Sequence, residues 1–574
     1  MRWRTRDWFA ALALYAITAG VVLWQNARVA VLWDVSYILE NATRISQGQL
    51  PYRDFPFPYA PLTFLTQAAI IKFFGRVYSH HIAYAAIAGG AATVLAWRII
   101  LRLLCGRVQH AWFSALLLAA PCCVLGVYCI FPHPFYDPDC TLVMLLAVAA
   151  LLRIEDLEAS VPISRFALIA TGALLVLPVF IKQNIGLVFT FAILAALMLD
   201  AALAWRRGQH ETAKRDGWIV GGAAMSALIA VALISVTVGF GNYVHWTVKF
   251  AASRRMPAWH EMLSVYTNPA LSVWLLCMFV GAVVALAVRK NLASGISVVL
   301  LTAPFSWAVI YLALDADVSE RAERLLAVWP PVMVASFMIT VIGWRLQRGL
   351  RRWIPLVLIA TVHATFLSQQ LWGSTYALWP VLLVLIACAL STFADHRSKA
   401  TTPLMLVVPQ AVAAVVGITL TIAGVFYMRS EERLSYVNVE DGALMHSSIP
   451  ALSGVAMRGP YLPNFEELVR FSDRKIPRGD GIVMLPGEDL FYFTTGRTPQ
   501  FPALMFDHTV NPYNSAEELV DAVRARTNIR WIVLKRALQL QEEPMPEQQR
   551  VLDLLEPEFE LVEKLDNYDV YRRK

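Results

Sequence analysis

Apolar segments close to 20 residues long recur along this chain from Trp8 to Tyr427. A helix needs about 20 apolar residues to cross the hydrocarbon core of a bilayer. Only 16% of the 574 residues are charged, whereas soluble domains carry about 25%. The sequence therefore predicts a polytopic α-helical membrane protein.

The 20-residue criterion places about 13 transmembrane helices before Arg429. They cover residues 8–32, 79–103, 111–131, 138–153, 164–181, 184–204, 217–240, 269–288, 293–312, 324–343, 354–371, 376–393 and 403–427. After Arg429, charged residues become frequent and no long apolar segment remains. We therefore expect a transmembrane domain at 1–429, with a first external loop at 33–78, and a small soluble domain at 430–574.

Basic residues predict the orientation of these helices. With a cytoplasmic N-terminus, the inner segments carry Arg2, Arg4, Arg6, Arg98, Arg102, Arg107, Arg206, Arg207, Lys214, Arg215, Arg289, Lys290, Arg345, Arg348, Arg351, Arg352, Arg397 and Lys399. The outer loops carry the carboxylates Asp34, Asp54, Asp137, Asp139, Asp315 and Asp317. Because Lys and Arg collect on the cytoplasmic side, the pattern predicts an external C-terminal domain, which is periplasmic in a bacterial inner membrane. The short apolar segment 61–74 favours an amphipathic helix on the outer interface.

The tail after residue 430 alternates short helices and strands. Helices are expected at 465–473, 489–495, 516–525 and 547–555, and strands at 481–485, 529–534, 559–565 and 568–572. The pattern predicts a small α/β domain without a nucleotide-binding glycine motif. By fold analogy alone, we interpret it as an acceptor-side or lid domain.

Four polar features fall on the predicted outer side. They are Asp34 with the loop Tyr52–Arg53–Asp54, then His133 with Asp137 and Asp139, then Lys182–Gln183, and finally the 241–268 segment with Arg254 and Arg255. Charged groups at a membrane are costly and tend to persist where they do chemistry or bind a ligand. Their collection on one side therefore indicates a functional site.

Each feature also has a structural interpretation, and these alternatives stay open. Asp34 could cap an interfacial helix, and Asp137 with Asp139 could form a turn and helix N-cap. Lys182 could extend its amine to the interface. The two arginines at 254–255 could meet anionic headgroups.

The residue types suit transfer of a sugar from a lipid phosphate. A carboxylate can take the proton of the acceptor hydroxyl, and cations can stabilise the charge that develops on the departing phosphate. The net charge of +7 comes with no phosphate-binding glycine loop and no aromatic-basic sheet, so nucleic acid is not expected as a partner.

The arrangement resembles the GT-C superfamily of integral-membrane glycosyltransferases, which use polyprenyl-phosphate-linked sugars. The likeness is to the branch of the aminoarabinose and lipopolysaccharide-core transferases, and more distantly to protein O-mannosyltransferases. Asp34, followed by the loop 48–61 and the helix 61–74, matches the first acidic motif of the family. The segment 136–139 matches the second acidic motif, and Lys182–Gln183 matches a lysine-containing turn.

The resemblance implies roles for particular residues. Asp34 corresponds to the catalytic base and Lys182 to a phosphate ligand, with Asp137 and Asp139 as further catalytic candidates. Candidate substrate-binding residues are Tyr52, Arg53, Asp54, His133, Gln183, Arg254 and Arg255. Two aspartates stand in the second motif, and which one faces the site stays open. The late loop 369–376 lacks the basic or histidine-rich pattern of relatives and supplies no ligand.

The implied activity is an inverting hexosyl or pentosyl transfer to an envelope acceptor, which is lipopolysaccharide, another glycolipid, a polysaccharide or a protein. No cofactor is indicated, and a divalent metal is left open. A transporter or lipid-linked-sugar flippase is the alternative, although it predicts charges at mid-membrane and helices broken in symmetric halves. A non-catalytic component of envelope assembly is the second alternative.

Overall fold

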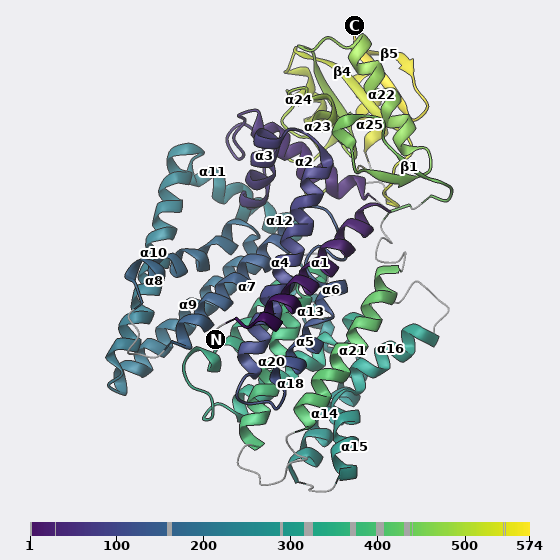
Figure 1. Ribbon diagram of the computed structural model, residues 1–574. Coiled ribbons are helices and arrows are strands. Elements are labelled where there is room, and N and C mark those ends of the chain that lie inside the picture. The colour runs from purple at the N-terminus through teal and green to yellow at the C-terminus, as the bar shows by residue number, and fades with distance from the viewer. Residues whose placement is uncertain are drawn as a thin grey trace.

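The protein is mostly helical and carries a small sheet-containing domain at its C-terminal end (Figure 1). The computed structural model describes residues 3–28, 30–157, 163–287, 291–314, 325–367, 375–397, 407–429, 437–438, 440–542, 545 and 547–574. Arg2, Arg289, Lys290, Asp315, Asp317, Lys399 and most of the loop 369–376 lie outside the described residues.

The helical part contains long helices joined by short ones. Its helices are α1 (Thr5–Asn26), α2 (Leu32–Ser46), α3 (Leu62–Phe74), α4 (Tyr78–Leu104), α5 (Ala111–Ala119), α6 (Cys122–Leu125), α7 (Tyr136–Glu155), α8 (Arg165–Val176), α9 (Gln183–Arg206), α10 (His210–Thr237), α11 (Phe240–Val244), α12 (Ala251–Arg255), α13 (Trp259–Leu263), α14 (Pro269–Ala287), α15 (Asn291–Leu301), α16 (Ala303–Leu314), α18 (Trp329–Ile342), α19 (Ile354–His363), α20 (Trp379–Arg397) and α21 (Val408–Arg429).

Within the described ranges, α1, α4, α9, α10 and α21 are each long and apolar enough to cross a membrane. Two helix pairs, bent by 46° and 62°, raise this number from 5 to at most 7. Six further apolar helices are shorter, at 10–17 residues. One reason is that proline and glycine interrupt apolar segments: the predicted helix 111–131 is divided at Pro121 and loses its helical backbone at Gly126.

The first predicted transmembrane helix ends earlier than expected, and Asp34 lies in a separate helix. Helix α1 ends at Asn26, and Asp34 lies in the first turn of the separate helix α2. The expectation of a polar loop starting at Asp34 was wrong, because Val35, Ile38 and Leu39 recur at helical spacing and are buried. Helix α3 matches the helix expected at 61–74 and packs against α2.

The predicted inner segments meet at one end of the helical part. Arg98 lies 3.7 Å from Asp7, and Arg102 lies 3.4 Å from Asp156. Asp156 also pairs with Arg351 at 2.6 Å. These ion pairs join the N-terminal segment, the end of α4, the end of α7 and the segment before α19, as the charge pattern predicts.

The C-terminal domain has a four-stranded sheet in the order β3-β4-β6-β5. Strands β3 (Gly481–Leu485) and β4 (Ile529–Lys535) are parallel, and β6 (Tyr568–Arg573) pairs antiparallel with both β4 and β5 (Phe559–Lys564). Its helices are α22 (Tyr461–Lys475), α23 (Phe491–Thr495), α24 (Ala516–Arg524) and α25 (Gln548–Leu555). The predicted elements of the tail are confirmed, and a short hairpin of β1 (Leu444–His446) and β2 (Ala456–Arg458) is added.

One face of α2 joins the two parts, and Figure 1 shows α2 and α3 next to the C-terminal domain. Ser36, Glu40 and Arg44, spaced by four residues, all bond to backbone groups of that domain. The Glu40 carboxylate accepts the N–H groups of Tyr492 and Phe493 at 3.0 and 2.9 Å. Burial raises the pKa of Glu40 to about 8. Helix α2 is therefore a largely buried helix against which the C-terminal domain packs.

Candidate active site

A buried ion pair joins the second acidic motif to the lysine turn. Lys182 precedes the first turn of α9, and its Nζ lies 2.8 and 2.9 Å from the two carboxylate oxygens of Asp137 in the first turn of α7. The Asp137 side chain is only 2% exposed. The same amine lies 4.3 Å from the ring centroid of Tyr136. Burial lowers the pKa of Lys182, and the Asp137 carboxylate opposes that shift.

Asp34 lies against His133 at the start of α2. Its Oδ2 is 3.9 Å from His133 Nε2, and its side chain is 20% exposed while that of His133 is 4% exposed. The imidazole stacks between Phe131 and Phe135, with centroid distances of 6.0 and 5.8 Å. Burial lowers the pKa of His133 to about 4, so the ring is neutral near pH 7. The Asp34 carboxylate is thus more accessible to solvent than that of Asp137, which is buried in an ion pair with Lys182.

Arg255 brings a second cation to the same place. It ends α12, and its guanidinium lies 4.6 Å from the ring centroid of Tyr59. The guanidinium donates to the Tyr59 hydroxyl and, at 2.8 Å, to Thr509 Oγ1 of the C-terminal domain. Tyr59 stacks on Tyr136 with a centroid distance of 5.5 Å. Arg255 therefore lies over the ring of Tyr59 and Lys182 over the ring of Tyr136, and these two rings stack on each other.

Asp139 occupies a different environment. Its carboxylate accepts hydrogen bonds from Thr63 and Tyr84, both at 2.7 Å, and from Tyr128. These hydroxyls come from α3, α4 and the segment before α7, and Asp139 is 5% exposed. Of the two aspartates in the second motif, Asp137 is the one that contacts Lys182. Asp139 instead accepts hydrogen bonds from three other segments of the chain.

Tyr52 and Gln183 hold the segment that carries Tyr59. The Tyr52 hydroxyl donates to the Tyr59 carbonyl at 2.5 Å, and its backbone takes the left-handed φ of 67°. Gln183 donates to the Pro58 carbonyl at 2.9 Å and accepts the Ala60 N–H at 3.2 Å. Both side chains are thus engaged in fixing residues 58–60.

The remaining candidates make surface contacts. Arg53 pairs with Asp54 at 2.8 Å, and the Asp54 carboxylate also accepts the N–H of Leu50 at 2.7 Å. Arg254 donates to Asn514 of the C-terminal domain at 2.6 Å. These contacts stabilise the turn at 50–54 and attach α12 to that domain.

Sequence reasoning missed two kinds of site residue. Tyr59 and Tyr136 could have been found, because they lie within the motifs that were singled out. Thr509 reaches Arg255 across 254 residues of sequence, and no local pattern marks it. Among the described residues, no group of three His, Cys, Asp or Glu side chains could hold a metal ion.

Comparisons with known proteins identify similar structures only. No protein-family model matches the chain, and no curated protein matches it significantly. The chain is similar to the crystal structure of ArnT from Cupriavidus metallidurans bound to undecaprenyl phosphate, at 12% identity and TM-score 0.43, covering 99% of this chain and 98% of that one. The apo form gives 14% identity, TM-score 0.42 and coverage of 98% and 97%.

A third similar structure is the oligosaccharyltransferase of Archaeoglobus fulgidus in complex with zinc and sulfate. It shows 12% identity and TM-score 0.45, covering 92% of this chain and 68% of that one. Both proteins are GT-C glycosyltransferases, the class that the sequence motifs resemble.

Proposed function

We propose that this protein is a glycosyltransferase that moves a sugar from a polyprenyl-phosphate donor to an envelope acceptor on the outer face of a bacterial inner membrane. The observation that carries the proposal is the gathering of three charged groups around the stacked rings of Tyr59 and Tyr136. Arg255 and Lys182 lie over these rings. Burial raises the pKa values of both tyrosines, and the Asp34 carboxylate is close enough to add to that rise. A carboxylate that is 20% exposed and two cations thus lie around the same pair of aromatic rings.

In the proposed reaction, Asp34 takes the proton of the acceptor hydroxyl. The acceptor oxygen attacks the anomeric carbon, and the bond from that carbon to the phosphate oxygen breaks. The polyprenyl phosphate leaves with the bonding electron pair, so the configuration at the anomeric carbon inverts. General-base catalysis of this kind contributes about 10²–10⁴-fold in rate.

The two cations contribute differently to binding the phosphate. The hydrogen bonds of Arg255 go to the neutral hydroxyls of Tyr59 and Thr509, while the Asp507 carboxylate acts on its charge through space. Lys182 already shares its charge with Asp137. Arginine also presents a planar fork that can grip two phosphate oxygens, whereas lysine acts as a point charge. We therefore assign phosphate contacts to both side chains, a contact with two oxygens to Arg255 and a point-charge contact to Lys182.

Sugar transfer is tested most directly by mass spectrometry. Glycolipids, polysaccharides and glycoproteins from cell envelopes with and without the gene should differ by one sugar residue on one acceptor class. Purified protein in detergent should then transfer that sugar from the matching polyprenyl phosphate. If sugar moves only across sealed vesicles and never onto an acceptor, the flippase alternative replaces this proposal.

The proposed site requires the C-terminal domain to lie outside the cytoplasm. A C-terminal reporter that works only outside the cytoplasm should be active, because the ion-paired segments rich in Arg lie at the opposite end of the helices. The same reporter inserted between Arg345 and Arg352 should be silent. The reverse pattern would contradict both the orientation and the site.

A further inference from the structure

We propose that the C-terminal domain positions the catalytic carboxylate through Gln539, which clamps the first turn of α2. This inference rests on the proposed function, because it takes Asp34 as the base. Gln539 does not touch the site itself. It acts through the backbone that carries Asp34 and is therefore a positioning residue.

The clamp consists of two hydrogen bonds from one buried side chain. Gln539 Oε1 accepts the N–H of Leu32 at 2.8 Å, and Gln539 Nε2 donates to the carbonyl of Ala30 at 3.0 Å. Leu32 is the first residue of α2, two residues before Asp34. The first N–H groups of a helix have no partner within the helix. Gln539, which is 2% exposed, supplies that partner from the other domain.

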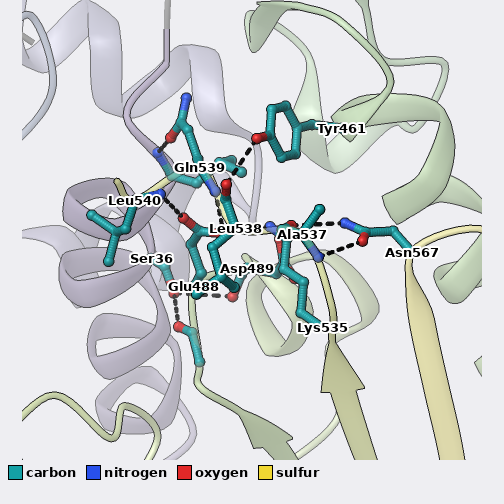
Figure 2. A network of polar contacts seen from close by, with 12 residues as sticks. Ser36, Tyr461, Glu488, Asp489, Lys535, Ala537, Leu538, Gln539, Leu540 and Asn567 are labelled. Carbon is teal, nitrogen blue, oxygen red and sulfur yellow. Dashed lines mark hydrogen bonds and ion pairs between the residues drawn. The ribbon is translucent and has the colours of Figure 1, made fainter. Parts of the chain in front are cut away.

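Gln539 is itself held by a buried charged network, shown in Figure 2. The Glu488 carboxylate accepts the backbone N–H of Gln539 at 3.1 Å and that of Leu540 at 2.9 Å. Lys535 Nζ lies 2.6 Å from Glu488 and 2.8 Å from Asp489. None of these three charged side chains is more than 7% exposed. Breaking a buried pair of this kind is strongly unfavourable, so the carboxylate that fixes Gln539 has little freedom.

The segment between Lys535 and Gln539 is fixed as well. Asn567 bonds both the N–H and the carbonyl of Ala537, at 2.8 and 3.0 Å, and Tyr461 donates to the Leu538 carbonyl at 3.0 Å (Figure 2). The backbone that carries Gln539 is therefore held by hydrogen bonds at the two preceding residues. This fixes the position of the amide oxygen and nitrogen that bond to the start of α2.

The same domain grips the next turn of α2 from one side. The Ser36 hydroxyl contacts the carbonyls of Gly487 at 3.1 Å and Asp489 at 2.9 Å. Successive helix residues are about 100° apart, so Asp34 lies about 200° around the helix from Ser36. Asp34 thus points away from the domain and toward His133. The domain fixes one face of the turn while the carboxylate is presented on the other.

Loss of the clamp should lower turnover more than substrate binding. A misplacement of about 1 Å at a reacting group can cost about 10²-fold in rate. We expect Gln539→Met, which keeps the length of the side chain but lacks both hydrogen-bonding groups, to lower kcat by about 10-fold or more. The KM for the polyprenyl-phosphate donor should change by less than about twofold, since the side chain of Gln539 bonds to the backbone of Ala30 and Leu32 and not to Lys182 or Arg255.

The matched control is Gln49→Met. Gln49 is also a glutamine that joins the end of α2 to the C-terminal domain, donating to the Pro499 carbonyl at 2.9 Å, but it lies at the opposite end of the helix from Asp34. This variant should keep kcat within about twofold of wild type. Equal loss of kcat in both variants would reduce the effect to domain docking, and a rise in KM without a fall in kcat would overturn the positioning role.

Hydrogen exchange separates this inference from the proposed function. Peptides covering residues 30–36 should exchange faster in Gln539→Met than in wild type or Gln49→Met, whether or not the protein transfers sugar. If wild type transfers no sugar, the proposed function fails while exchange still decides the clamp. If Gln539→Met does not fold, Ser36→Ala should show the same faster exchange and a smaller fall in kcat. Unchanged exchange in the folded variants would overturn the proposal.

Discussion

Asp34→Asn is expected to lower the rate of sugar transfer by about 10²–10⁴-fold, the usual contribution of a general base. Asparagine keeps the size and polarity of the side chain but cannot accept the proton of the acceptor hydroxyl. The Asp34 side chain is 20% exposed, so the substitution should leave the melting temperature nearly unchanged. The measurement is kcat of purified protein in detergent with a polyprenyl-phosphate sugar donor.

The same substitution at the other aspartates provides the controls. Asp54→Asn should keep activity within about twofold, because Asp54 pairs with Arg53 in an exposed turn. Asp139→Asn should mainly lower stability, since three hydroxyl donors converge on that buried carboxylate. Full activity in Asp34→Asn, together with loss in Asp137→Asn, would mean that the base is misassigned. Activity in all four variants would remove the proposed mechanism.

The second large effect is expected at Lys182, where charge and stability must be separated. Lys182→Met alone leaves the Asp137 carboxylate buried without its cation, and breaking a buried pair costs about 3–5 kcal/mol. The double variant Lys182→Met with Asp137→Asn removes both charges and should fold. It should bind the polyprenyl-phosphate donor about 10–100-fold more weakly, because hydrogen bonds to charged groups contribute about 1.5–3 kcal/mol.

Asp137→Asn alone distinguishes the two roles of Lys182. This variant removes the carboxylate that competes with phosphate for the amine, so donor affinity should not fall. Titration of polyprenyl phosphate followed by tryptophan fluorescence measures this, with the melting temperature recorded for each variant. If Asp137→Asn weakens donor binding as much as the double variant does, Lys182 supports the fold rather than the phosphate.

Local patterns predicted much of this fold. The alternation of short elements after residue 460 gave the strands and helices of the C-terminal domain, because each element carries its own periodicity and turn residues. The charge pattern correctly grouped Arg98, Arg102 and Arg351 at one end of the helices. The expectation of a loop at 33–78 missed helix α2, whose charged residues Glu40 and Arg44 are buried against the C-terminal domain.

The candidate site was predictable only in part, for a physical reason. Lys182 and Asp137 lie within short motifs, and opposite charges on the same predicted side suggest proximity. Thr509 and Gln539 lie in the tail, and their contacts with Arg255 and Leu32 join parts of the chain that are 254 and 507 residues apart. Local sequence carries no signal for such pairing, because neither residue type nor spacing distinguishes these two side chains from others in the tail.

The partners of α2 in the C-terminal domain are synthesised long after α2 itself. Leu32 and its partner Gln539 are separated by 507 residues, which take roughly 25–100 s to synthesise at 5–20 residues per second. During that interval the polar row Ser36, Glu40 and Arg44 has no partner yet. Helix α2 is therefore synthesised early but gains its last partners late. A chain that stops between Gln183 and Gln539 holds both acidic motifs and the lysine turn but lacks the clamp, so the proposed site is complete only after Gln539 has been synthesised.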